Sequence, residues 1–235
     1  MPNQKMLAVG LRLRKPAYVE RSVSRRGGSR RLVDRAFKRG FDVSTALVAL
    51  ALLLPLFLLV ALAIWMVDGG SPFYSHNRLG RGRKNFGCLK FRTMRVDSQQ
   101  ALDRHLADNP AALAEWNLTR KLKDDPRITP IGHLLRKSSV DELPQLINIV
   151  RGDMSIVGPR PIVEAEIEKY GDASLAYFAV RPGLTGAWQV SGRSDTTYDE
   201  RVRLDRHYVE HRSFVGDLVI IFRTIPAVFM VKGSY

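Results

Sequence analysis

The stretch RKSSVDELPQLINIVRGDMSIVGPRP, residues 136–161, places two adjacent acids, Asp141 and Glu142, in basic and apolar surroundings. Pro144 follows almost at once. Because proline has no backbone N–H, a helix tolerates it in the first turn and not in the interior. The stretch therefore predicts a helix from about 140 to 150 that begins at the acids, with Ser139 and Glu142 arranged as a capping box.

The acid pair has a structural and a chemical interpretation. Structurally, each carboxylate at a helix N-terminus interacts favourably with the helix dipole, by ~0.3–1 kcal/mol. Chemically, the same position keeps a carboxylate ionised, as a nucleophile or a Mg²⁺ ligand requires. Arg136, Lys137 and Arg160 lie nearby in the sequence and would attract phosphate oxygens. The pair alone does not decide between these interpretations.

The charge of the chain is unevenly distributed. The 235 residues include 37 Lys and Arg against 23 Asp and Glu, a formal net charge of +14. Residues 1–41 hold twelve of the basic residues and two acids, residues 42–95 hold seven and two, and residues 96–235 hold eighteen and nineteen. A nucleic-acid-binding domain would carry its cations over its folded surface. The neutral C-terminal part argues against that class, and no nucleic-acid partner is expected.

The basic excess flanks VSTALVALALLLPLFLLVALAIWMV, residues 43–67, which has no charge. About 20 apolar residues suffice for a helix to cross a bilayer, and the segment starts too late for a secretory signal peptide. Basic residues normally mark the cytoplasmic side only, yet both flanks are basic, and Pro55 at the middle would bend a helix. A helix that enters one leaflet, bends at Pro55 and returns to the same face satisfies both observations. A kinked spanning helix is the alternative.

Three parts are expected along the chain. Residues 1–30 are predicted to be a basic, largely disordered arm, residues 31–69 an amphipathic lead-in and the membrane helix, and residues 70–235 a folded domain. Cys88 is the single cysteine, which excludes an internal disulfide and fits a reducing compartment. Free cysteine is more often a core residue than a nucleophile, and Cys88 is expected to be one.

Within residues 70–235 the patterns favour helices and one β-hairpin, which turns at Gly80-Arg81-Gly82. Helices are expected at 98–122 with a division at Asn109-Pro110, at 131–136, at 140–150, at 164–180 with a break near Gly171, and at 197–213. Residues 181–195 are expected to form a loop. The final stretch, 214–235, is apolar on one side and fits either a helix in the membrane interface or a core helix.

Five segments, taken together, resemble the bacterial sugar transferases called monotopic phosphoglycosyl transferases. They follow the family's order: KRGFD (38–42), the Pro-interrupted apolar run, KFRTM (90–94), DDPRITPIGHLLRKSSVDELPQLINIVRGDMSIVGPRP (124–161) and RPGLTGAWQVSGR (181–193). The chain is similar to the short form of this family, without the extra N-terminal membrane domain. Family members commonly have Ser before the membrane proline, whereas this chain has Leu54, so the bend lacks a hydroxyl that would satisfy freed backbone groups.

The resemblance implies a mostly α, monotopic enzyme whose catalytic domain lies on the cytoplasmic face of the bacterial inner membrane. Asp141 would attack the β-phosphorus of a UDP-sugar and expel UMP, and undecaprenyl phosphate would then take the sugar phosphate from Asp141. Glu142 would hold Mg²⁺ with Asp141 or assist the incoming phosphate, and Arg136 would orient the pair. A cationic site with Mg²⁺ agrees with phosphoryl transfer, which depends on positioning and charge stabilisation. The substrate contacts expected are Lys90, Arg92 and Arg160 to phosphate, and Gln189 and Arg193 to the nucleotide. A purely structural role is the alternative at the last two positions.

The resemblance also leaves alternatives. Galactose-1-phosphate is the expected cargo, and glucose-1-phosphate is the alternative because the two hexoses differ in the orientation of one hydroxyl. The product would start an exopolysaccharide repeat unit, with downstream glycosyltransferases as partners. A non-catalytic scaffold of the polysaccharide machinery is disfavoured by the intact Asp141, Glu142, Arg136 and Arg160, and a multi-pass prenyl-phosphate transferase by the single apolar segment. A homodimer is the simplest hypothesis for the assembly.

Overall fold

A computed structural model describes residues 28–191 and 196–229. The chain divides into two units, residues 1–37 and 38–235. The described part of the first unit belongs to helix α2 (Gly28–Asp68), which continues into the second unit. The disordered arm was predicted at residues 1–30. Residues 1–27 lie outside the described residues, and residues 28–30 begin α2.

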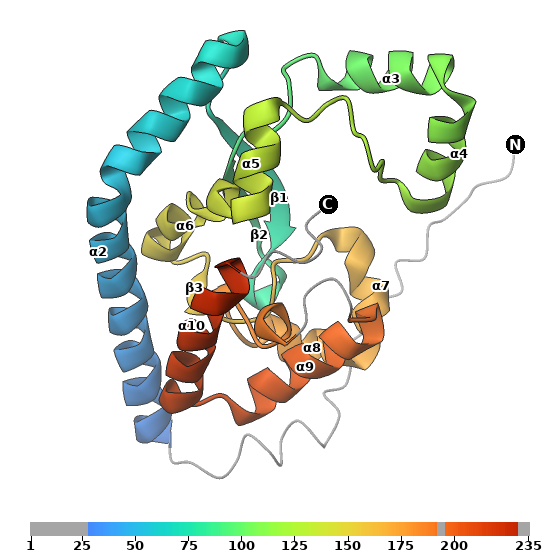
Figure 1. The fold of residues 1–235 in the computed structure, drawn as a ribbon. Helices are drawn as coiled ribbons and strands as arrows, with labels where there is room; N and C mark the ends of the chain where they lie inside the picture. Colours follow the sequence, from blue (N-terminus) through green and yellow to red (C-terminus); the bar gives the residue numbers. More distant parts are fainter. Residues whose placement is uncertain (1–27, 192–195, 230–235) are drawn as a thin grey trace, which may run out of the picture. The chain divides into compact units, whose positions relative to one another are not determined.

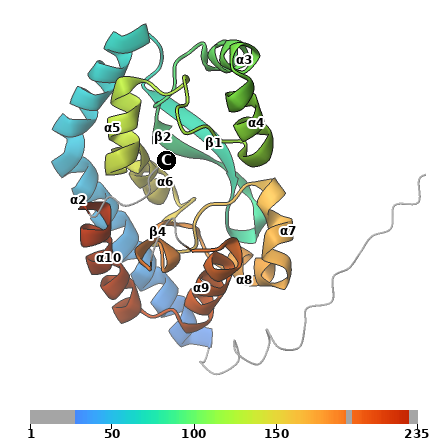
Figure 2. The same ribbon diagram turned by 45° about the vertical axis from the view of Figure 1, so that its right-hand side comes forward.

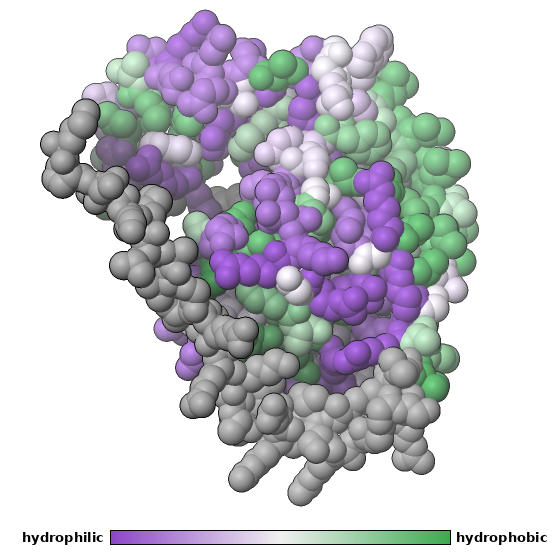
Figure 3. Space-filling view, turned by 180° about the vertical axis from the view of Figure 1, so that it is seen from behind, coloured by the Kyte–Doolittle hydropathy of each residue, from purple (hydrophilic) through white to green (hydrophobic). Residues whose placement is uncertain are grey.

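Within the second unit, one narrow face of α2 packs on the rest of the domain. Its members recur every three or four residues, which is the spacing of one helix face; they are Ala46, Leu50, Leu53, Phe57, Val60 and Ile64. Most other apolar side chains of α2 are exposed, Leu52 by 75% and Met66 by 72%. Figure 3 shows the hydrophobic band along the edge of the molecule that α2 forms. One face of α2 thus packs on the domain, and most apolar side chains on the other faces are exposed.

Pro55 lies inside α2, which bends partway along its length but is not broken (Figure 1). From Val33 to Asp68 the helix is long and apolar enough to cross a membrane, judged by length and composition. The re-entrant path and the kinked spanning path both stay predictions.

Two small sheets lie among the helices of the domain. The predicted hairpin is confirmed: β1 (Phe73–Leu79) pairs antiparallel with β2 (Asn85–Phe91) around a turn in which Gly82 has a φ of 70°. The second sheet was not predicted, because β3 (Ser155–Val157) and β4 (Gly183–Thr185) have only three residues each and pair in parallel. Residues 181–195 are therefore not all loop. A Cβ on Gly183 would come within 2.1 Å of the Gly158 nitrogen, so the close approach of these segments requires glycine.

The mostly helical prediction is confirmed. Asn109 caps the second of two helices and Pro110 begins it, as the predicted division requires. The helices of the domain are α3 (Ser98–Asp108), α4 (Pro110–Thr119), α5 (Pro130–Ser138), α6 (Gln145–Arg151), α7 (Ile167–Tyr170), α8 (Ser174–Phe178), α9 (Tyr198–His211) and α10 (Phe214–Phe229).

Helix α10 packs on the domain with one face and leaves an apolar face exposed. One face packs on β3 and β4, and the hydroxyls of Thr224 and Thr185 lie 2.7 Å apart. The opposite face is exposed and apolar, and it includes Val215, Val219 and Phe222. The helix is therefore part of the domain core, while its contact with a membrane stays a prediction.

A buried polar network joins the KRGFD segment of α2 to the domain. Asp42 is 2% exposed and accepts hydrogen bonds from the Ser155 hydroxyl at 2.8 Å and the Ile156 N–H at 3.2 Å. The Lys38 ammonium lies 3.5 Å from Asp42 and 2.7 Å from Asp217 of α10. Helices α2 and α10 lie side by side in Figures 1 and 2. This network attaches the N-terminal side of the apolar run of α2 to β3 and α10.

Replacing Asp42 by Ala is expected to lower the midpoint of thermal unfolding in detergent by about 10 °C. It leaves Lys38 with one counter-charge and the buried Ile156 N–H without an acceptor, while the Ser155 hydroxyl keeps the Val157 carbonyl at 3.0 Å. Breaking this buried pair costs roughly 3–5 kcal/mol, and each kcal/mol lowers the midpoint by about 2–4 °C in a chain of this size. The matched control is Arg203→Ala, which breaks an exposed pair with Glu200 at 3.3 Å and is expected to cost under ~1 kcal/mol. Equal midpoints for the two variants would contradict this account.

Candidate active site

The acid pair lies in a short 3₁₀ turn, Val140–Glu142, between α5 and α6. The predicted capping box is wrong. Ser139 ends α5 in the left-handed conformation, with a φ of 57°, and its side chain makes no capping hydrogen bond. Pro144 precedes the first residue of α6. The chain reverses too sharply at Ser139 for a helix to begin there, so a tight link between two helices presents the acids.

Lys90, on strand β2, contacts both acids. Its ammonium nitrogen lies 2.7 Å from Oε1 of Glu142 and 3.4 Å from Oδ2 of Asp141. Asp141 is the more buried acid, with 10% of its side chain exposed against 29% for Glu142. The predicted site residue Lys90 is therefore brought to the acid pair, where it neutralises part of their combined charge.

Burial and the neighbouring cations act in opposite directions on the pKa of Asp141. Burial raises the pKa of its carboxyl above the ordinary value, Glu142 raises it further, and the charges of Lys90 and Arg136 partly offset this. Burial lowers the pKa of Lys90, but the charges of Glu142 and Asp141 outweigh that effect and raise it overall. The cations, and not a helix N-terminus, are therefore what favours the ionised form of Asp141.

Arg136 comes from α5 and is half-buried. Its Nε donates a hydrogen bond to the hydroxyl of Thr93 at 2.9 Å. Its charge lowers the pKa of Asp141, so the two side chains interact electrostatically. Thr93 was not singled out in the sequence, although it belongs to the KFRTM segment. The role of Arg136 in orienting the acid pair stays a prediction.

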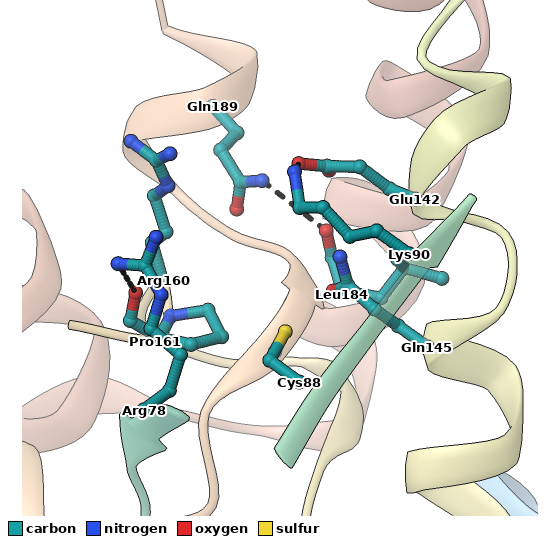
Figure 4. A pocket seen from close by; sticks show the side chains of 10 residues that line it. Arg78, Cys88, Lys90, Glu142, Gln145, Arg160, Pro161, Leu184 and Gln189 are labelled. Carbon is teal, nitrogen blue, oxygen red and sulfur yellow. Dashed lines mark hydrogen bonds and ion pairs between the residues drawn. The ribbon is translucent and has the colours of Figure 1, made fainter. Parts of the chain in front are cut away.

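An open pocket with about 300 Å³ of empty volume is lined by Glu142 of the acid pair (Figure 4). The predicted residues Lys90, Arg160 and Gln189 meet here, together with Glu142. The remaining lining residues are Arg78, Cys88, Gln145, Pro161, Gly183 and Leu184. Three cationic side chains therefore face a single pocket, as a phosphate-bearing substrate requires. Arg193 lies outside the described residues.

Arg92 is not brought to this pocket. Its guanidinium pairs with Asp68 at the end of α2, and Asp68 also accepts a hydrogen bond from the Val96 N–H at 3.1 Å. Strand β2 ends at Phe91, so Lys90 and Arg92 no longer share one strand face. The structure gives Arg92 a structural contact, which fixes the end of the apolar helix to the domain.

Two further residues shape the site and were missed in the sequence. Arg78 of β1 donates to the Pro161 carbonyl at 3.1 Å and lies 3.6 Å from Glu166. Asn148 of α6 is fully buried, accepts from the Leu89 N–H at 2.9 Å and donates to the Gly87 carbonyl at 2.8 Å. Asn148 thereby joins α6 to the strand that carries Lys90. A single amide in the apolar run LINIV was the available signal.

Cys88 is buried, and burial raises the pKa of its thiol to about 11. The thiol is therefore protonated at neutral pH, as expected of a core residue.

The acid pair fits a Mg²⁺ ion in part. In the described ranges no three His, Cys, Asp or Glu side chains gather as a metal site. Mg²⁺ is commonly held by one or two carboxylates together with substrate phosphates and water. Asp141 and Glu142 suit that arrangement, which needs substrate to complete it.

Comparisons with known proteins show the family of this chain. The profile of the family described as "Bacterial sugar transferase" matches residues 33–231. The chain is 54% identical over 208 residues to "Exopolysaccharide production protein ExoY" of Sinorhizobium fredii, covering 88% of this chain and 92% of that protein. It is 46% identical over 202 residues to "Undecaprenyl-phosphate galactose phosphotransferase" of Salmonella typhimurium, covering 86% of this chain and 42% of that protein.

A third relative carries a different sugar in its name. "UDP-glucose:undecaprenyl-phosphate glucose-1-phosphate transferase" of Caulobacter vibrioides is 37% identical over 206 residues, which is 84% of this chain and 72% of that protein. The match to the family profile covers the acid pair, the pocket and both sheets. The chain belongs to the bacterial sugar transferase family.

Proposed function

We propose that this protein transfers hexose-1-phosphate from a UDP-sugar to undecaprenyl phosphate and so starts an exopolysaccharide repeat unit. The observation that carries the proposal is the acid pair bridged by Lys90 beside a pocket lined by Arg78 and Arg160. The names of the relatives support the lipid acceptor and the polysaccharide product.

In the first step, an oxygen of Asp141 attacks the β-phosphorus of the UDP-sugar, and the bond to the UMP oxygen breaks. In the second step, an oxygen of undecaprenyl phosphate attacks the same phosphorus and releases Asp141. Two observations favour Asp141 over Glu142 as the nucleophile. It lies farther from Lys90 than Glu142 does, and it is the more buried acid, so that burial raises the pKa of its carboxyl. Glu142 would keep Lys90 in place or assist the acceptor phosphate.

The cations of the pocket would hold the phosphate oxygens. Arg78 is already fixed by its bond to the Pro161 carbonyl, and the Arg160 guanidinium lies 5.8 Å from the centre of the Trp188 ring. Cations held in place before the substrate arrives stabilise charge in the transition state without reorganising. Arg160 is the side chain we expect to contact the diphosphate, and Arg136 is expected to orient Asp141.

Mg²⁺ is the proposed cofactor. Asp141 and Glu142 would hold it, and when bound it would neutralise charge on the diphosphate and on the departing UMP. Lys90 contacts both acids in this structure, so it would release at least one of them when Mg²⁺ binds.

We place the protein on the cytoplasmic face of the inner membrane. The exposed apolar faces of α2 and α10 support contact with lipid. The prenyl chain of the acceptor stays in lipid, so the pocket has to lie near the interface. A re-entrant α2 that bends at Pro55 meets this requirement, with both basic flanks on one side.

Galactose-1-phosphate is the proposed cargo. The galactose phosphotransferase of Salmonella typhimurium is 46% identical to this chain and the glucose enzyme of Caulobacter vibrioides 37%. Glucose-1-phosphate is the second candidate, since one hydroxyl distinguishes the two donors. The lipid-linked product would pass to downstream glycosyltransferases.

The covalent step predicts that label from UDP-galactose or UDP-glucose labelled at the β-phosphate stays on the protein with Mg²⁺ and no lipid acceptor. We expect one UMP per label, and loss of the label in Asp141→Asn because an amide is not a nucleophile. Asp172→Asn, a change at an exposed acid, is the matched control and is expected to label normally. Label that survives in Asp141→Asn would contradict the assignment. If neither sugar labels the protein and no UMP forms even with polyprenyl phosphate, the scaffold alternative is favoured.

The electrostatics predict a shift in the pH dependence of labelling. The rate should rise with pH as Asp141 ionises. Removing a cation disfavours the ionised carboxylate of Asp141, so Lys90→Met is expected to move the midpoint of the pH–rate profile to higher pH. Lys90→Arg is expected to keep this midpoint near the wild-type value. Lys84→Met removes an exposed lysine and serves as the control. A midpoint that stays constant or falls in Lys90→Met would show that Lys90 does not favour the ionised form of Asp141.

A further inference from the structure

Gln189 presents an unpaired acceptor to the pocket. It lies in the short turn Trp188–Val190, across the pocket from Lys90 and Glu142 (Figure 4). Its Nε2 donates to the Leu184 carbonyl at 3.2 Å. Its Oε1 is buried and has no hydrogen-bond partner in the part of the chain that the structure describes. In Figure 4 this oxygen points toward the space between Arg160 and Cys88.

The orientation of the amide follows from its neighbour. If the amide were reversed, Oε1 would face the Leu184 carbonyl, and two acceptors would meet. The turn around it is tightly packed, because a Cβ on Gly186 would come within 2.3 Å of the Gly158 carbonyl oxygen and 3.1 Å of Oε1. The side chain therefore offers one acceptor to the pocket. An unpaired buried acceptor is unfavourable until a donor reaches it.

The chemistry of the pocket indicates which group of the substrate donates a hydrogen bond to Oε1 of Gln189. Lys90, Arg78 and Arg160 can only donate hydrogen bonds, so they suit the phosphate oxygens. Hydroxyl groups of the transferred sugar need acceptors as well. Glu142, the neighbour of the proposed nucleophile Asp141, lines the pocket, so the hexose on the reacting phosphate would lie close to it.

We propose that Oε1 of Gln189 accepts a hydrogen bond from a hydroxyl of the hexose and thereby contributes to the choice of sugar. This rests on the proposed function, because it assumes that a UDP-hexose reacts at Asp141. A site built to bond a substrate hydroxyl discriminates strongly against a donor that lacks it, since its own polar group is then left unpaired. Gln189 is thus a specificity residue for the sugar.

The experiment compares four donors, UDP-galactose with the 2-, 3-, 4- or 6-hydroxyl replaced by hydrogen, by their kcat/KM for labelling Asp141. We expect the wild-type protein to lose roughly 10- to 100-fold with the donor that lacks the recognised hydroxyl. In Gln189→Met, which has no acceptor, that donor should react as well as UDP-galactose itself. Gln189→Glu keeps an acceptor and should keep the discrimination. Gln99→Met, at an exposed position, is the matched control and should behave as the wild type.

Two results would overturn the proposal. In the first, wild type and Gln189→Met show the same losses across the four donors and differ only in thermal midpoint, which makes Gln189 structural. In the second, Gln189→Met weakens inhibition by UMP while the losses of kcat/KM with the deoxy sugars persist. The hydrogen-bond partner of Gln189 would then belong to the nucleotide. In both, label on Asp141 from UDP-galactose would still support the proposed function, so the two failures are distinguishable.

Discussion

Two neighbouring carboxylates in a partly buried turn repel each other, and burial disfavours the charge of each. The Lys90 ammonium, 2.7 Å from Glu142 and 3.4 Å from Asp141, offsets this cost. The offset works only if strand β2 and the turn between α5 and α6 are held at a fixed separation. Asn148 does this by bonding the β2 backbone on both sides of Cys88. The geometry of the site therefore depends on one ion-pair cluster and the amide that maintains it.

A second set of contacts couples this site to the apolar helix. Asp42 and Lys38 bind α2 to β3 and α10, Arg39 donates to the Ile149 and Val150 carbonyls at the end of α6, and Asp68 pairs with Arg92 at the other end. The helix is thus attached at both ends of its apolar run. If lipid surrounds its open faces, the depth of α2 sets the depth of the pocket. A membrane-bound acceptor phosphate would then meet the acids at a constant height.

Local signals in the sequence predicted a large part of this fold. The hairpin around Gly82 and the division before Pro110 follow from backbone restrictions that act within a few residues. The parallel β3–β4 pair was missed because its three-residue strands come from segments with no strand pattern, and their pairing depends on close approach at Gly158 and Gly183. The capping box at Ser139 failed because the chain reverses there.

The candidate site shows the same division. Lys90, Arg160 and Gln189 were predicted from the family resemblance of their segments, and they meet in one pocket. Arg92, two residues after Lys90, does not, because a partner 24 residues earlier holds it. Arg78 and Asn148 act through tertiary contacts to residues 161, 87 and 89. Their importance depends on which strands and helices meet, and spacing along the chain carries little of that information.

The central claim is that Asp141, held beside Lys90, becomes covalently attached to the sugar phosphate. The most direct test is mass spectrometry of protein quenched after mixing with UDP-galactose and Mg²⁺, followed by assignment of the modified residue within the peptide that contains both acids. The account predicts a hexose-phosphate adduct on Asp141 that undecaprenyl phosphate removes. An adduct on Glu142, or turnover to lipid product with no adduct at any time, would contradict it.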